Sequence, residues 1–294
     1  MVRGWKVSIN DLTKACRAKW GESECTARCR LATAYHLVSR QKWDELIYGH
    51  LTLRVPGTDH FLINPFGMPY SLITARSLVK VDLDGNVIDP GCSKFSFQRT
   101  GYVIHSAIHE ARKDLNALIH IHTSEGMAVA SSVERLQPVC QHSVFIEPIS
   151  YHPYRGIVVD QTERMELARN FPAPSKCLVM RSHGLLTGGG TIEEAFLLMF
   201  YLHAVCKVYV DAGYTHRPVP EKFLVSSDIV EKSVRDTLAN NFADGSFGLK
   251  DFQAMALELD REGMCTGYPY SEEISKLLGW HEVDNEPCGT VEIS

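Results

Sequence analysis

Apolar residues recur at helical spacing in three parts of the chain. Over residues 24–43, Leu31, Tyr35, Val38 and Trp43 fall near one stripe, which predicts a helix with one buried face. A second stripe over residues 102–114 predicts another helix, and residues 195–210 are apolar almost throughout. The T-x-x-E sequence that begins at Thr191 is typical of a helix start, so we expect it to open a central buried helix over 195–210.

Between these helices the pattern is that of short strands. "HLTLRV" alternates, "PGTD" provides a turn and "HFLINP" returns, which predicts a β-hairpin. "SLVKVDLDGNVID" predicts a second hairpin, with its turn at residues 84–86. "ALIHIH" and "KCLVMR" are predicted strands, and "SHGLLTGGG" turns and partly returns. "TSEGMAVASS" predicts a short helix capped by Thr123 or Ser124.

Helices and strands are interleaved, which indicates an α/β protein with helices against one main sheet. We divide the chain into an N-terminal extension over residues 1–23, a main domain over 24–217 and a C-terminal extension over 218–294. The C-terminal extension begins at Pro218 and Pro220, contains predicted helices at 225–240 and 251–262, and ends in an acidic tail.

Composition and charge narrow the classes of function. The chain has 294 residues, of which 45% are hydrophobic and 22% charged, as in ordinary globular proteins. A net charge of -5 argues against nucleic acid as a partner. The start "MVRGWKVSIND" has no apolar signal region, and residues 195–210, interrupted by His203 and Lys207, are too short to span a bilayer. We therefore expect no transmembrane segment and a cytoplasmic location.

Nine cysteines are spread along the chain without a dense framework. Cys25 and Cys29 share one face of a predicted helix and are candidates for half of a zinc site. No second Cys/His pair lies nearby at zinc-finger spacing, so we favour free buried thiols in a reducing compartment.

The strand "ALIHIH" carries two histidines, His120 and His122, two residues apart. Residues at this spacing in a strand project to the same face, so the two imidazoles could share one metal ion. His183 is the best candidate for a third ligand, because it ends an apolar strand and precedes Gly184, which would let the backbone turn tightly. Buried imidazoles that only pack and form hydrogen bonds are the alternative, and the spacing alone leaves both open.

The stretches "GYVIHSAIHEARKDLNALIHIHTSEGMAVA" and "VMRSHGLLTGGGTIEEAF" resemble the class II aldolase/adducin family, and most closely its adducin-like branch. The resemblance also includes "WDELIYGHLTLRVPG", "FLINPFGMPYSLITARSLVKVDLDGNVID" and "DREGMCTGYPY", so it covers most of residues 24–270. It implies a three-layer α/β/α fold around a central mixed, largely antiparallel sheet. It further implies a homo-oligomer, commonly a tetramer, and one divalent metal ion per subunit held by His120, His122 and His183. Zinc is the first expectation, with Fe(II) or Mn as alternatives.

One departure from the family's aldolases concerns the acid/base group. Those enzymes carry a glutamate before the H-x-H strand as metal ligand and acid/base, and its position falls on Gly101 here. His105 lies one helical turn later on the same face, and is our candidate to replace the glutamate as ligand and catalytic group. His109, another turn along, is expected to act at most through a ligand.

A second departure concerns the phosphate site. The family's G-N-x-S loop reads "GHLT" at residues 49–52, and two serine positions read Arg99 and Thr100. The candidate substrate-binding residues are therefore His50, Thr52, Arg99 and Thr100, and Arg99 would suit a carboxylate.

The resemblance implies a metal-dependent lyase that performs aldol cleavage or decarboxylation of a small carbonyl or carboxylate substrate. A non-catalytic, adducin-like protein associated with the actin and membrane cytoskeleton is the first alternative, and a non-haem iron oxygenase on the same fold is the second. Tyr268 and Tyr270 in "TGYPY" are candidate catalytic residues that could close over the site of their own or a neighbouring subunit. A tyrosine-rich packing corner is the alternative for these two.

Overall fold

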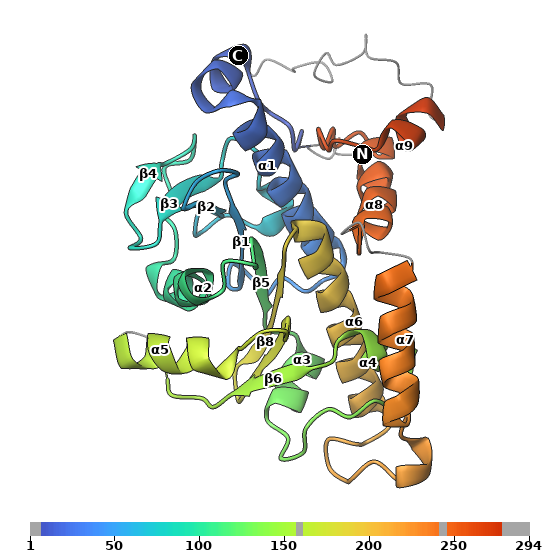
Figure 1. The fold of residues 1–294 in the computed structure, drawn as a ribbon. Helices are drawn as coiled ribbons and strands as arrows, with labels where there is room; N and C mark the ends of the chain where they lie inside the picture. The colour runs from blue at the N-terminus through green and yellow to red at the C-terminus, as the bar shows by residue number, and fades with distance from the viewer. Residues whose placement is uncertain (1–6, 157–160, 241–245, 278–294) are drawn as a thin grey trace, which may run out of the picture.

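The computed structural model describes residues 7–156, 161–240 and 246–277, and the strands within them form one mixed sheet (Figure 1). The strands lie in the order β4-β3-β2-β1-β5-β8-β7-β6. Neighbouring strands pair antiparallel except β6 and β7, which are parallel. The bounds are β1 His50–Arg54, β2 His60–Ile63, β3 Val79–Asp82, β4 Val87–Asp89, β5 Ala117–Ile121, β6 Ile149–His152, β7 Cys177–Met180 and β8 Gly184–Gly189.

Helices cover both faces of the sheet, which gives an α/β fold in three layers (Figure 1). α1 and α6 pack on one face with α8, while α2 and α5 pack on the other. The helix bounds are α1 Lys14–Arg40, α2 Arg99–Ala111, α3 Ser124–Ala130, α4 Gln141–Phe145, α5 Gln161–Asn170, α6 Ile192–Asp211, α7 Ser227–Asn240, α8 Leu249–Arg261 and α9 Glu272–Leu277, with short 3-10 helices η1 Tyr70–Leu72 and η2 Glu221–Phe223.

Side chains of the central strand β5 alternate between the two layers. Ala117, Ile119 and Ile121 belong to the larger core with α1 and α6. Leu118 belongs to the smaller core with α2 and α5. His120 follows Leu118 at strand spacing, so it faces the α2 side of the sheet.

Both hairpins predicted from the sequence are confirmed. β1 pairs with β2, with Thr52 opposite Ile63, and β3 pairs with β4. The turn between β3 and β4 contains Gly85 at φ +79°, a conformation that costs glycine little. β1 also pairs with β5, which places His50 opposite His120.

The first helix is longer at its start than we expected. α1 begins at Lys14, capped by the Thr13 side chain, and ends at Arg40 instead of residue 43. Gly21, at φ +73° and ψ +165°, interrupts the helical conformation inside it. Most side chains before this kink are exposed, so the segment carries no apolar stripe, and the sequence pattern gave no helical signal there.

Other differences have similar causes. α2 begins at Arg99, earlier than the predicted residue 102, because the apolar stripe starts only after Gly101. The expected short helix is α3, whose cap Thr123 accepts a hydrogen bond from the Gly126 amide. We did not predict α4, β6 or α5. The sequence of α5, "QTERMELARN", has no apolar periodicity.

α6 is the central buried helix that the sequence predicted. The Thr191 side chain accepts a hydrogen bond from the Glu194 amide at 3.1 Å, as a helix cap does. The Glu194 carboxylate accepts from the Gly190 amide at 2.7 Å, so it does not close the box on the cap residue itself. In the described part of the chain, none of the helices has both the length and the apolar character needed to cross a membrane.

Among the C-terminal helices, α8 packs into the core of the main domain. Phe252, Ala256 and Leu259 of α8 are buried in the same cluster as the side chains of α1 and α6. The predicted helices at 225–240 and 251–262 correspond to α7 and α8. The acidic tail lies mostly in residues 278–294, outside the described residues.

Candidate metal centre

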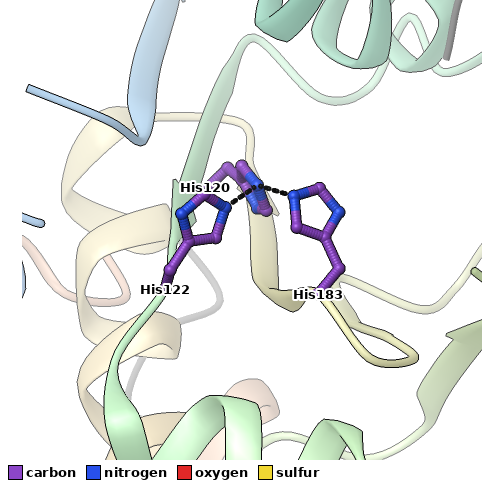
Figure 2. Close-up of side chains that lie close together, drawn as sticks. All are labelled: His120, His122 and His183. Atoms are coloured by element: carbon purple, nitrogen blue, oxygen red, sulfur yellow. Dashed lines mark hydrogen bonds between the residues drawn. The ribbon is translucent and has the colours of Figure 1, made fainter. Parts of the chain in front are cut away.

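The two histidines of the H-x-H strand end β5 side by side. His120 is the fourth residue of the strand and is buried, and His122 follows the strand and is partly exposed. Their Nε2 atoms lie 2.8 Å apart (Figure 2). The strand therefore directs both rings to one point, as the spacing predicted.

His183 approaches the same point from the turn between β7 and β8. Its Nε2 lies 3.4 Å from the Nε2 of His120, and Figure 2 shows the three rings converging. The turn is made by Ser182 at φ +53°, a conformation uncommon for a residue with a side chain.

Gly184 has a different role from the one we expected. The residue with positive φ in this turn is Ser182, so Gly184 is not what lets the backbone turn. A Cβ at Gly184 would lie 2.5 Å from the Ile121 carbonyl oxygen and 2.8 Å from Cδ2 of His122. Glycine therefore allows β8 to pack closely against the end of β5 and the His122 ring.

Hydrogen bonds fix which nitrogen of each strand histidine carries its proton. His120 Nδ1 lies 2.9 Å from the Leu185 carbonyl oxygen, and His122 Nδ1 lies 2.9 Å from a carboxylate oxygen of Glu45. Both partners accept only, so both Nδ1 atoms donate. In the neutral rings each Nε2 is then an unprotonated donor atom for a metal, and carbonyl and carboxylate partners of this kind orient metal-binding histidines.

The donor set fits a divalent metal ion. Nitrogens of His120, His122 and His183 all lie within 4.8 Å of one another. Two unprotonated Nε2 atoms that face each other at 2.8 Å leave both lone pairs unsatisfied, and a cation between them satisfies both. Three protein ligands with an open fourth position are typical of catalytic zinc sites.

Burial favours the neutral form of His183 and of His120. It lowers the pKa of His183 to about 4, with the nearby His122 and His152 rings acting in the same direction. Burial also lowers the pKa of His120 well below its ordinary value. Neutral imidazole is the form that binds a metal ion, so the site needs little proton release at neutral pH.

His105 does not lie among these three histidines, contrary to our expectation that it reaches the ion. Its Nε2 lies 3.0 Å from Nδ1 of His50, and its Nδ1 lies 2.8 Å from the hydroxyl of Thr52. Both ring nitrogens are therefore engaged. The reason is that α2 packs against β1, so one helical turn beyond Gly101 leads to β1 and not to the end of β5.

His109 continues the same set of contacts. Its Nε2 lies 2.8 Å from the Thr52 hydroxyl, and its Nδ1 lies 3.0 Å from the Leu115 carbonyl oxygen. Its ring stacks on Phe61, with the centroids 4.2 Å apart. Burial lowers the pKa of His109 and that of His50 to about 3 each, and the pKa of His105 well below its ordinary value.

His50 is the residue of this set that adjoins the metal centre. Its ring centroid lies 5.1 Å from that of His120. A Cβ at Gly101 would lie only 2.4 Å from Nε2 of His50, so the ring occupies the space that a side chain at position 101 would need. We expected Thr52 to bind a substrate. Its side chain is instead wholly buried and hydrogen-bonded to His105 and His109, so a substrate cannot reach it.

Arg99 and Thr100 form the first turn of α2, directly before Gly101. Arg99 lines a cavity of about 350 Å³ together with Tyr102, Glu110 and Arg164. None of the three converging histidines lines this cavity, so the structure does not bring Arg99 into contact with them.

Tyr268 and Tyr270 lie in a different part of the subunit. The Tyr268 hydroxyl donates to a carboxylate oxygen of Glu193 at 2.6 Å, and Tyr270 donates to Asp260 at 2.5 Å. Glu193 follows the end of β8 that pairs with the start of β5, whereas His120 lies near the other end of β5. Within the subunit the two tyrosines form the packing corner that was the alternative.

Sequence reasoning found the three converging histidines but missed the outer contacts. Both hairpins, α2 and β5 lie between Glu45 and His122 in the chain, so no sequence spacing links the two residues. For the contacts among the other histidines and Thr52, two spacings were available as signals. His50 and Thr52 are two residues apart on a predicted strand, and His105 and His109 are four apart on a predicted helix.

The chain is similar to proteins of known family. Residues 29–210 match the model of the "Class II Aldolase and Adducin N-terminal domain". Alpha-adducin of Rattus norvegicus is 34% identical over 92% of this chain, which spans 38% of the length of that relative. A putative aldolase class 2 protein of Caulobacter vibrioides is 38% identical over 85% of this chain and 95% of its own length.

Solved structures agree with the sequence match. An aldolase II superfamily protein from Pseudomonas syringae, 37% identical, superposes with a TM-score of 0.74 over 84% of this chain and 97% of its own. L-fuculose 1-phosphate aldolase from Glaciozyma antarctica, 26% identical, gives a TM-score of 0.68 over 81% of this chain and 91% of its own. With the fold and the histidine cluster, these matches show that the chain belongs to the class II aldolase and adducin family.

Proposed function

We propose that this protein is a metal-dependent lyase that performs aldol cleavage or decarboxylation of a small carbonyl or carboxylate substrate. The observation that carries the proposal is the convergence of three histidine ring nitrogens, with two of the rings held by acceptors behind them. The similarity to an L-fuculose 1-phosphate aldolase supports this class of chemistry.

The roles of the residues follow from the geometry. His120, His122 and His183 would hold the ion, and Glu45 and the Leu185 carbonyl would keep two of the rings oriented. When bound, a divalent ion would withdraw electron density from a substrate carbonyl as a Lewis acid. Nitrogen ligands suit zinc first, and Fe(II) or Mn as alternatives.

Arg99 and Thr100 are the proposed substrate contacts on the helix side. The guanidinium of Arg99 would pair with a substrate carboxylate through two parallel hydrogen bonds. Both residues belong to the first turn of α2, whose third residue, Gly101, lies against the His50 ring.

An adducin-like binding protein is the second candidate. The observation in its favour is the 34% identity to alpha-adducin across 92% of this chain. Under this proposal the histidine cluster is a structural site, and the partner is the actin and membrane cytoskeleton.

The test is a metal analysis of protein purified without added metal, followed by assays for aldehyde and carbon dioxide release. We expect about one ion per subunit, lost in His183→Ala, with His216→Ala on an exposed turn as the matched control. A metal-loaded protein without lyase activity that sediments with actin filaments would favour the second candidate. Bound iron with substrate-dependent oxygen uptake would indicate an oxygenase instead.

A further inference from the structure

A second cavity lies at the end of the sheet opposite to the candidate metal centre. Its volume is about 700 Å³, a size typical of small-molecule sites. Its walls come from one face of α1, the end of β1, the junction of β8 and α6, and the C-terminal corner at Pro269. Asn116 lines it directly before β5, whereas His120 lies near the other end of that strand. At about 3.3 Å per strand residue, roughly 13 Å separate the two along β5.

The α1 face of the cavity carries polar side chains that are not fully hydrogen-bonded. Ser23, Thr26 and Arg30 are spaced by three and four residues, so their side chains share one face of the helix. Among the residues that the structure describes, none forms a hydrogen bond with the hydroxyl of Ser23 or of Thr26. Ser23 is exposed and Thr26 is partly exposed, so both hydroxyls are accessible to a ligand.

Arg30 is the charged member of this face. Its Nε lies 3.3 Å from a carboxylate oxygen of Glu193, which is longer than the roughly 2.7–2.9 Å of a close charge-assisted hydrogen bond. The same oxygen accepts the Tyr268 hydroxyl at 2.6 Å, so Glu193 is shared between two groups. Within the described part of the chain, the two Nη nitrogens of Arg30 have no hydrogen-bond partner and are not buried. A guanidinium carries five N–H groups, so the four on these nitrogens remain available to a ligand.

The rest of the lining offers apolar surface and charges that already have partners. Arg54 pairs with a carboxylate oxygen of Asp59 at 2.5 Å, and Glu22 pairs with Arg17 at 2.7 Å. Among the described residues of the lining, Arg30 is therefore the group whose charge is left for a ligand. Apolar side chains make much of the remaining wall, namely those of Ala27, Leu53, Pro56, Ile192 and Pro269.

We propose that this cavity is a second ligand site and that it binds a monocarboxylate with an apolar chain. The carboxylate accepts hydrogen bonds from the Nη nitrogens of Arg30, and the chain lies along the apolar wall. One negative charge on the ligand matches the single positive charge of Arg30. Thr26, one helical turn before Arg30, donates its hydroxyl to the same carboxylate. The site is separate from the metal centre and does not depend on the proposed lyase activity.

The first test titrates the full-length protein with three probes that share an eight-carbon chain, namely octanoate, octan-1-ol and octylammonium. Calorimetry should show about one octanoate per subunit, bound more tightly than the alcohol and the amine. The amine should bind least, because its charge is repelled by that of Arg30. Equal binding of all three probes would indicate an unspecific apolar surface and would overturn the proposal.

Variants of two α1 residues locate the bound probe. Arg30→Gln should weaken octanoate binding about ten- to hundredfold, and Arg30→Lys, which keeps the charge, should weaken it less. Thr26→Trp should fill the cavity and abolish binding. Thr26 is only partly buried, so this variant tests the site even if Arg30→Gln, which leaves Glu193 without its cation, fails to fold. Arg40→Gln, at the end of α1 and outside the lining, is the matched control and should bind octanoate as the wild type does.

A further variant, His183→Ala, separates the cavity from the metal centre, where a carboxylate could bind an ion directly. Octanoate should bind to this variant as tightly as to the wild type. Binding that is lost in His183→Ala, or unchanged in Thr26→Trp, would place the probe elsewhere and contradict the proposal. A protein that binds octanoate in the cavity but holds no metal would support this site and count against the proposed function alone.

Discussion

The absence of a side chain at Gly101 determines which residue can occupy the space beside it. The resemblance to the family's aldolases assigns a glutamate to this position, and its absence here suggested a vacancy. The structure shows no vacancy, because the ring of His50 lies within 2.4 Å of where a Cβ would be. Glycine at position 101 and histidine at position 50 are therefore a matched pair.

This pairing predicts an unusual response to Gly101→Ala. In an open helix position alanine would stabilise by up to about 1 kcal/mol. Here it meets a buried, hydrogen-bonded ring, and we expect a loss of about 1–3 kcal/mol in the free energy of unfolding. Urea unfolding of metal-free protein measures it. In a His50→Ala background the same substitution should be neutral or stabilising, and equal losses in both backgrounds would contradict the pairing.

At the residue scale, the spacing of residues in the sequence was enough to identify the three converging histidines. His120 and His122 are adjacent on a strand, and His183 ends a strand, so local pattern was enough to bring them together as candidates. The role of His105 was wrong in position, since it depends on how α2 packs across β1, which no local pattern contains. Glu45 was missed for the same reason.

At the element scale the turn between β7 and β8 sets the position of His183. Ser182 takes up the left-handed conformation at φ +53°, and Gly184 lets the returning strand approach β5. The residues on either side of His183 therefore have separate roles: Ser182 turns the chain, and Gly184 allows it to pack closely.

Substitutions at Ser182 and at Gly184 should differ in how strongly they affect the site. Ser182→Gly removes the cost of a side chain at positive φ and should change stability by no more than about 1 kcal/mol, with metal affinity preserved. Gly184→Ala forces a Cβ against the Ile121 carbonyl and the His122 ring, and should lower both stability and zinc affinity. Competition with a chromogenic chelator measures the affinity. If Gly184→Ala bound zinc as tightly as the wild type, close packing there would not matter for the site.

Some helices and strands could be predicted from the sequence, and others could not. The amphipathic stripe of α2, the apolar run of α6 and the two hairpins follow from periodicity, and their elements were found. β6, which makes the parallel pair with β7, has only one buried residue in four, so it carries no strand signal of its own. Its place depends on the partner strand.

At the scale of the whole molecule, buried histidines tie stability to pH. Burial lowers the pKa of His50 and of His109 to about 3, below the value of about 6.5 expected in the unfolded chain. As the pH falls below about 6.5 the unfolded chain therefore takes up protons first. The stability contributed by each neutral ring is complete above that pH and is lost as the pH falls towards about 3.

We therefore expect metal-free protein to lose several kcal/mol of stability between pH 7 and pH 5, at up to about 1.4 kcal/mol per pH unit for each buried histidine. Urea unfolding across this range gives the slope. His109→Gln removes one such group and should reduce the slope by about one proton. A stability independent of pH over this range would show that these rings are not held neutral.

Exposed apolar side chains near the centre bear on assembly. Leu46 is 78% exposed and Tyr48 is 44% exposed, and both follow Glu45, which bonds to His122. We expect a homo-oligomer, most commonly a tetramer, in which such residues are covered. Light scattering should give the mass of this oligomer. Leu46→Asp should shift the measured mass towards smaller species, whereas Ile229→Asp on α7, the control, should leave it unchanged. A wild-type monomer at micromolar concentration would contradict this expectation.

The hydrogen-bonded side chains of His50, Thr52, His105 and His109 occupy buried volume that leucine or phenylalanine could fill. Replacing a buried polar set by apolar groups of similar size is often stabilising. At these four buried positions, a gain in folding stability would therefore come with the loss of the hydrogen-bonded arrangement. Heat selection or consensus redesign that rewards melting temperature alone would be drawn to them first. We expect such a campaign to yield a more stable protein in which the His50 ring is no longer held beside His120 by His105.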